Sequence, residues 1–237
     1  MSAVGPAWRR DVLAYRYPIR SLFSDDFSDL AFLGPLLGDR RVVQLGESSH
    51  GIAEFNWMKV RLIKFLHERL GYDVIAFESP MTDCDAAGET AAKESPENTM
   101  RSCIFGVWHT DEVLALFDYI RKTQATPRPL RLTGFDNQAS AGYGATGQRF
   151  RTMLEFLDPA SVPALLRHEA TLRNITRQNA DGLLAFYTGL LQTLEQNRVR
   201  LLAHLTDHPG WVDLAIQEAR SRIALVRMRS LPMGQGF

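Results

Sequence analysis

The sequence predicts an α/β fold in which a short parallel sheet is flanked by helices and a large helical second half acts as a cap. Three observations lead to this prediction. Short apolar runs bounded by polar residues or glycine occur at 42–45, 72–78 and 130–135, the pattern of buried strands. A long amphipathic stretch joins the first two runs, and a strand–helix–strand unit makes its strands parallel. After Gly147 only helical spacing is found.

The strongest predicted helix covers residues 52–70. Its apolar residues recur every three or four positions, and Gly71 stands where a helix-ending glycine belongs. Further helices are expected at 29–37, 86–93, 111–122, 149–157, 163–179, 182–205 and 211–228. The length suits one domain covering residues 1–237, with a sheet core at about 38–137 and a helical cap region at about 147–228.

Composition and charge narrow the possible functions. The 237 residues contain 27 Lys and Arg and 27 Asp and Glu, so no net field favours nucleic acid or an acidic membrane. No secretory signal or run of roughly 20 apolar residues is found. Cys84 and Cys103 have neither metal-ligand spacing nor a disulfide pattern, and reduced thiols are expected. We therefore expect a soluble cytoplasmic protein.

The candidate site is the turn between the first predicted strand and the long helix, Gly46-Glu47-Ser48-Ser49-His50-Gly51. Ligands bind open α/β sheets beyond the carboxyl ends of the strands. Each of the three predicted strands runs into an acidic residue at that end, namely Glu47, Glu78 and Asp136. The shared edge is expected to bring His50 and these carboxylates together.

His50 is the candidate general base. An imidazole titrates near neutral pH, so its neutral form can take a proton from water or an alcohol. The following helix N-terminus disfavours the imidazolium, whereas Glu47 or Glu78 would favour it and fix the tautomer of the ring. The alternative interpretation is a histidine that only hydrogen-bonds within its own turn.

The remaining candidates each have two interpretations. Glu78 can orient the histidine or polarise water, or it can form an ion pair with Lys59 or Arg61. Asp136 can belong to the site or cap a turn. His109 is a candidate for lining the site.

Two other hydrolase chemistries match the sequence in part. A serine hydrolase requires Gly-x-Ser-x-Gly at a strand-to-helix turn, and here Ser48 is in place but His50 replaces the second glycine. A metal-dependent hydrolase would use Glu47, His50, Glu78 and Asp136 as ligands, but these residues lack any specific zinc spacing. No metal or other cofactor is expected.

Four motifs resemble those of the erythromycin esterase family. They are Val42–Gly51, Val74–Glu78 and, less specifically, Trp108–Glu112 and Leu132–Asp136. The resemblance implies hydrolysis of a lactone or other carboxylic ester, in the best-known members the macrocycle of erythromycin-type antibiotics. It also implies that histidine activates water directly, without a covalent serine intermediate and without an obligatory metal.

The resemblance assigns roles residue by residue. His50 matches the general base, Glu47 and Glu78 match the acidic site residues, and Lys59 lies where antibiotic-cleaving members carry a functional arginine. An ammonium supplies charge without the planar two-point geometry of a guanidinium. The family's second catalytic histidine, in an Ala-His-Asn-x-His-like motif, has no counterpart here, so a C-terminally truncated chain is expected. A non-catalytic, small-molecule-binding member is therefore the alternative to an active esterase.

Overall fold

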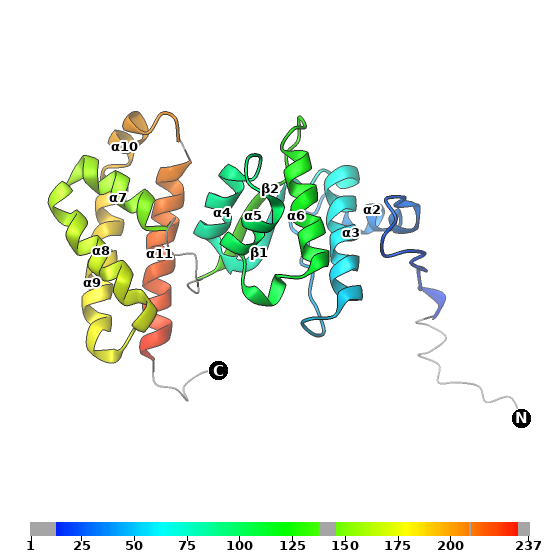
Figure 1. Cartoon of the computed structure of the whole chain (residues 1–237), viewed down its shortest axis with the longest axis horizontal. Coiled ribbons are helices and arrows are strands. Elements are labelled where there is room, and N and C mark those ends of the chain that lie inside the picture. The colour runs from blue at the N-terminus through cyan, green and yellow to red at the C-terminus, as the bar shows by residue number, and fades with distance from the viewer. Residues whose placement is uncertain (1–12, 138–145, 209, 232–237) are drawn as a thin grey trace, which may run out of the picture.

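The computed structural model describes residues 13–137, 146–208 and 210–231, which form an α/β region and a helical bundle (Figure 1). The elements of the α/β region are η1 (Ser28–Leu30), α2 (Leu33–Leu37), α3 (Ala53–Leu70), β1 (Val74–Pro80), α4 (Met81–Thr90), α5 (Pro96–Cys103), η2 (Gly106–Trp108), α6 (Asp111–Thr123) and β2 (Arg131–Asp136). The elements of the bundle are α7 (Thr146–Leu157), η3 (Pro159–Ser161), α8 (Val162–Thr171), η4 (Leu172–Asn174), α9 (Arg177–Gln196), α10 (Arg198–His204) and α11 (Trp211–Ser230). The predicted α/β class, with a helical second half, is confirmed.

The sheet consists of β1 and β2, which pair in parallel as expected. Val74 lies opposite Arg131 and Phe77 opposite Gly134, and after an irregularity Pro80 lies opposite Asp136. In Figure 1 α4 lies on the side of the sheet that faces the bundle, whereas α6 and α3 lie on the other side. The core around the sheet joins all three helices to β2 through Val60, Cys84, Ala87, Leu116, Phe117, Ile120, Leu130 and Leu132.

The prediction of a third strand at 42–45 was wrong. Within the described residues the sheet has two strands, and the backbone of 42–45 joins neither of them. Val42 was expected to be buried in this strand, but it is 75% exposed. Val43 packs against the cluster that contains Phe65 and Leu66 of α3. A β-branched run suits a strand only where a neighbouring strand supplies the partners for its backbone groups. Neither strand of the described residues pairs with this run.

The ends of the helices follow local capping chemistry. Gly71 ends α3 with a φ of 82°, and the Tyr72 N–H donates to the Leu66 carbonyl at 3.1 Å. Helix α5 was not predicted from the sequence. Its N-cap is Ser95, whose hydroxyl accepts from the Asn98 N–H at 3.1 Å. The helix predicted at 86–93 begins earlier, at Met81, because it follows β1 directly.

Two predicted helices of the second half are interrupted. The one expected at 163–179 ends at Thr171, and α9 begins anew behind Thr176, which forms a capping box with Asn179. The one expected at 182–205 breaks at Asn197 between α9 and α10. The bundle has its own apolar core, which includes Phe150, Met153, Leu165, Leu183, Tyr187, Leu194, Leu201, Val212, Ala219 and Val226.

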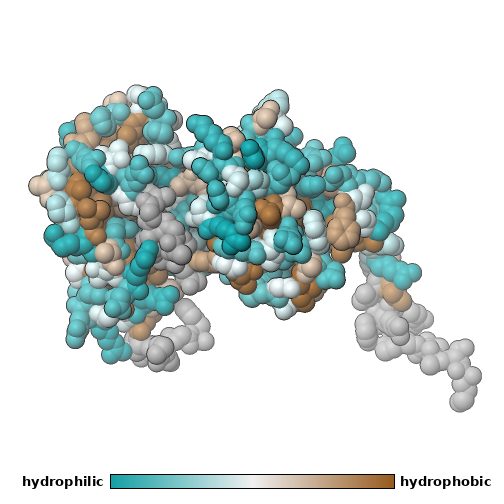
Figure 2. All heavy atoms as spheres, in the orientation of Figure 1, coloured by the Kyte–Doolittle hydropathy of each residue, from teal (hydrophilic) through white to brown (hydrophobic). Residues whose placement is uncertain are grey.

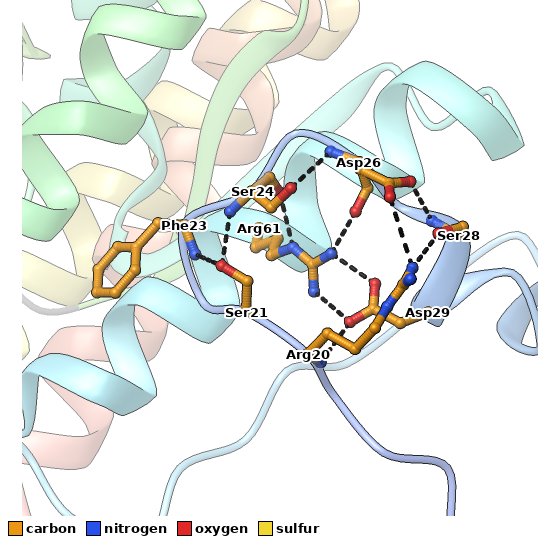
Figure 3. Close-up of polar contacts among 8 residues, drawn as sticks. All are labelled: Arg20, Ser21, Phe23, Ser24, Asp26, Ser28, Asp29 and Arg61. Carbon is orange, nitrogen blue, oxygen red and sulfur yellow. Dashed lines mark hydrogen bonds and ion pairs between the residues drawn. The ribbon is translucent and has the colours of Figure 1, made fainter.

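The N-terminal segment is held against α3 by Arg61 (Figure 3). The Arg61 side chain is 3% exposed, and its guanidinium donates to both carboxylate oxygens of Asp29, at 2.5 and 3.1 Å. It also donates to the carbonyls of Ser24 at 2.8 Å and Asp26 at 2.5 Å. The Arg61 hydrogen bonds hold the pKa of the Asp29 carboxyl well below its usual range.

The two cysteines are free and buried, and the Cys84 thiol lies 3.6 Å from the Cys103 carbonyl. The surface seen in Figure 2 is mostly hydrophilic, with apolar side chains in small groups rather than one broad patch. None of the helices in the described part of the chain combines the length and apolarity that crossing a bilayer requires.

Candidate active site

The turn before α3 brings an imidazole and a carboxylate into contact. The Nδ1 atom of His50 lies 2.5 Å from Oε1 of Glu47. Gly51 follows with a φ of 73°, a conformation that a residue with a Cβ rarely adopts, and thereby turns the chain into the helix. A carboxylate beside Nδ1 favours the tautomer with its hydrogen on that nitrogen, so the lone pair of a neutral ring lies on Nε2.

The two side chains differ in exposure. The Glu47 side chain is 15% exposed, whereas that of His50 is 59% exposed. The carboxylate is therefore a shielded, fixed partner, and the imidazole can meet a molecule from solvent.

Lys59, one of the predicted site residues, completes the contacts of Glu47. It extends from α3, and its Nζ lies 2.7 Å from Oε2 of Glu47. The ammonium also lies 5.0 Å from the ring centroid of Trp108, a cation–π contact. Glu47 thus bridges a lysine and a histidine, one on each oxygen.

Trp108 is a residue of the site that the sequence analysis did not single out. It belongs to η2 and is buried, and its ring meets the His50 ring edge to face at 5.3 Å between centroids. Its neighbour His109, the predicted candidate, instead has Nε2 3.1 Å from the Ile104 carbonyl. The sequence shows two adjacent rings, Trp108 and His109, and which of them faces His50 depends on the tertiary packing.

Glu78 and Asp136 lie at the carboxyl ends of β1 and β2, so they share one edge of the sheet as expected. Glu78 is exposed, and within the described residues its carboxylate forms no ion pair with His50, Lys59 or Arg61. The predicted alternative of an ion pair to Lys59 or Arg61 was therefore wrong, because those cations bind Glu47 and Asp29.

The two strands approach closely at this edge. A Cβ at Gly134 would collide with the backbone of Ser79 and Pro80, which β1 places against β2. Glycine is therefore required at this position for the strand ends to come together.

The predicted alternative of a metal site has no counterpart in the described ranges. No three His, Cys, Asp or Glu side chains of those ranges come together in a metal-holding group. Glu47 and His50 are in contact, but Glu78 and Asp136 do not join them in such a group.

The arrangement can act as a general base. Nδ1 of His50 is bound to a shielded carboxylate, and the carboxylate is fixed by Lys59. Nε2 belongs to an exposed ring and is able to accept a proton from water. A carboxylate partner holds the ring orientation and stabilises the imidazolium that forms on proton transfer.

Comparison with known proteins gives a consistent set of relatives. The model of the family described as erythromycin esterase matches residues 67–228. This match includes Glu78, His109 and Asp136 and begins after the turn that carries His50.

Two curated relatives and one solved structure illustrate the similarity. The putative hydrolase YbfO of Bacillus subtilis (strain 168) is 50% identical over 207 residues, covering 82% of this chain and 45% of YbfO. Erythromycin esterase type II of Escherichia coli is 26% identical over 119 residues, covering 50% of this chain and 28% of that protein. A mutant of the erythromycin esterase EreC in its open conformation has a similar fold, with a TM-score of 0.68 and 20% identity over 87% of this chain and 56% of that one. The matched regions cover less than half the length of these curated relatives.

Proposed function

Because the chain belongs to the erythromycin esterase family, we propose that it is a hydrolase that cleaves a carboxylic ester or lactone with water activated by His50. The observation that carries the proposal is the 2.5 Å contact of His50 Nδ1 with Glu47, which orients the ring and leaves Nε2 as the basic atom. The ester class of the substrate is taken from the names of two relatives, the type I and type II erythromycin esterases. A macrolide lactone is therefore the first substrate to test.

The proposed reaction needs one base and one water molecule. Nε2 of His50 takes a proton from water while the water oxygen attacks the ester carbonyl carbon, which gives a tetrahedral intermediate. The intermediate collapses as the bond to the alcohol oxygen breaks, and Nε2 returns its proton to that oxygen. The products are a carboxylic acid and an alcohol, or one opened hydroxy acid from a lactone, and His50 is again neutral.

The other residues support this base. Glu47 stabilises the imidazolium through Nδ1–H, and Lys59 and Trp108 fix the carboxylate and the ring. We assign Glu78 and Asp136 to positioning the water or the substrate, since they lie near the carboxyl ends of the two strands at one edge. Lys59 and His109 remain proposed contacts for the substrate.

The proposal is tested by mass spectrometry of erythromycin and of a panel of simple esters and lactones incubated with the purified chain. The expected product of erythromycin gains one water. The His50→Ala variant should lose this activity, whereas His204→Ala, an exposed histidine stacked on Phe156 in the bundle, should keep it. Thermal stabilisation by erythromycin or an ester without any product would instead support the binding-protein alternative.

A further inference from the structure

A cleft lies between the α/β region and the bundle, away from His50. Its volume is about 380 Å³, within the range of small-molecule pockets. It is lined by residues of α4, α5, α7 and α11, and it shares no lining residue with the group of Glu47, His50, Lys59 and Trp108. Arg149 of α7 and Glu89 of α4 face each other across it.

Arg149 has an unusual environment for a guanidinium. Its side chain is 2% exposed, and Nη2 lies 3.2 Å from Oε1 of Glu89. The buried Nη1 has no hydrogen-bond partner in the part of the chain that the structure describes. A buried donor without an acceptor is costly, so a ligand that accepts from Nη1 would gain binding free energy there.

The partner of Arg149 is less firmly held. Glu89 is 42% exposed and stands near the end of α4. The same oxygen, Oε1, accepts from the indole N–H of Trp211 at 2.9 Å, and the Arg149 guanidinium lies 5.7 Å from the Trp211 ring centroid. An exposed carboxylate can turn to solvent at small cost, which would leave the guanidinium and the indole N–H directed at an incoming acceptor.

We propose that this cleft binds a small organic monocarboxylate, which takes the place of the Glu89 carboxylate. Its two oxygens accept from Nη1 and Nη2 of Arg149, the two-point geometry that a planar guanidinium favours. The exchange replaces one carboxylate by another, so the charge of the site does not change. Ala86 and Ala87 supply an apolar wall for the body of the acid.

The charge around the cleft selects against more highly charged anions. Asp83, buried on the preceding turns of α4, also lines the cleft. Its negative charge opposes a dianion more strongly than a monoanion. Inorganic phosphate is therefore expected to bind more weakly than a monocarboxylate.

The test uses benzoate, with benzyl alcohol as the neutral molecule of similar shape and inorganic phosphate as the alternative anion. Isothermal titration calorimetry of the full chain should detect benzoate, and Arg149→Gln should weaken its binding at least tenfold. Glu89→Gln should strengthen it several-fold, because the competing charge is removed while an amide oxygen remains for Trp211. Arg151→Gln, which removes an exposed arginine of the same helix paired with Glu155, should leave binding unchanged.

The opposite responses of the two variants separate a ligand site from a purely structural ion pair. If Arg149 and Glu89 only join the two regions, both substitutions lower the melting temperature and neither strengthens benzoate binding. The proposal is overturned by absence of benzoate binding, by equal binding of benzyl alcohol or phosphate, or by weaker binding to Glu89→Gln. These outcomes do not depend on ester hydrolysis, because none of the varied residues belongs to the His50 group.

Discussion

Nδ1 of His50 lies 2.5 Å from Oε1 of Glu47, three residues earlier in the same turn. The base and its orienting carboxylate are thus assembled within one short segment that leads into α3. This pair does not depend on the third strand predicted at 42–45, because Gly51 and the start of the helix set the course of the chain. The proposed chemistry rests on this local contact.

Glu47→Gln is expected to lower kcat for ester hydrolysis by roughly 10²–10⁴-fold with little change in KM. The amide carries no charge to stabilise the imidazolium, and its single oxygen must serve both Lys59 and Nδ1–H of His50. Steady-state kinetics on the ester identified by mass spectrometry would measure this. Glu97→Gln, which removes an exposed partner of Arg101, serves as the matched control. Undiminished turnover in Glu47→Gln would contradict the role assigned to this carboxylate.

Asp29→Asn is expected to remove an acid-sensitive contribution to stability. Because the folded-state pKa of Asp29 is depressed, the ionised group stabilises the fold above its ordinary pKa of about 4 and loses this effect as pH falls below that value. At pH 7 the substitution should cost about 3 kcal/mol, since it breaks a buried ion pair with Arg61. In thermal melts, the loss of stability caused by Asp29→Asn should become smaller as the pH is lowered toward 2.

Asp25→Asn is the control for that experiment, because Asp25 pairs with Lys64 from an exposed position. It should change the melting temperature little at any pH. A cost of Asp29→Asn that does not vary between pH 7 and pH 2 would show that the ionised carboxylate is not what stabilises this segment.

Gly134→Ala is expected to destabilise the protein by roughly 1–3 kcal/mol, because the added methyl group collides with the backbone of β1 near Ser79 and Pro80. Gly182→Ala is the matched control: that glycine lies in α9 with open space around its Cα, so alanine should stabilise by roughly 0.5–1 kcal/mol. Urea unfolding would measure both. Equal effects of the two substitutions would contradict the close approach of the strands.

Glu218→Gln is expected to stabilise the bundle as pH rises. Burial raises the pKa of Glu218, although Arg222 at 3.4 Å opposes this effect. A raised pKa means that the folded chain binds the proton more tightly than the unfolded chain, so the stability from Glu218 is greatest at low pH and declines as pH rises. Glutamine keeps the shape without this titration, and its advantage should grow by up to about 1.4 kcal/mol per pH unit above the ordinary carboxyl pKa.

Thermal melts from pH 5 to pH 8 would follow this advantage. Glu195→Gln, on the exposed side of α9 with Arg220 as partner, should show no such trend. A variant of Glu218 that loses stability at pH 8 relative to pH 5 would mean that the carboxylate is ionised and required.

The parts of the fold that the sequence predicts well are those fixed by local chemistry. The helix α3 and its end at Gly71 follow from periodicity and a glycine with positive φ. The strands β1 and β2 were predicted from short apolar runs, and the two runs pair with each other in the sheet. The run at 42–45 has a similar composition, but neither strand of the described residues pairs with it. Its own sequence carries no information on whether a partner strand is present.

In the site, too, contacts within one segment could be predicted, whereas contacts between distant segments could not. The pair of Glu47 and His50 could be predicted because both residues lie in one turn. Trp108 meets His50 only through the packing of η2 on the turn, 58 residues later in the chain, and the adjacent His109 was the more obvious candidate. The contact between Glu89 and Arg149 joins two regions of the fold and has no local signal.

The role of His50 as the base is decided by the rate of ester hydrolysis by the wild-type chain and by His50→Ala, each with and without added imidazole. Circular dichroism would establish that both are folded. We expect His50→Ala to lose roughly 10²-fold or more in rate, and free imidazole to restore part of the rate, because only the proton acceptor is missing. Hydrolysis by His50→Ala at the wild-type rate would contradict the assignment of His50 as the base.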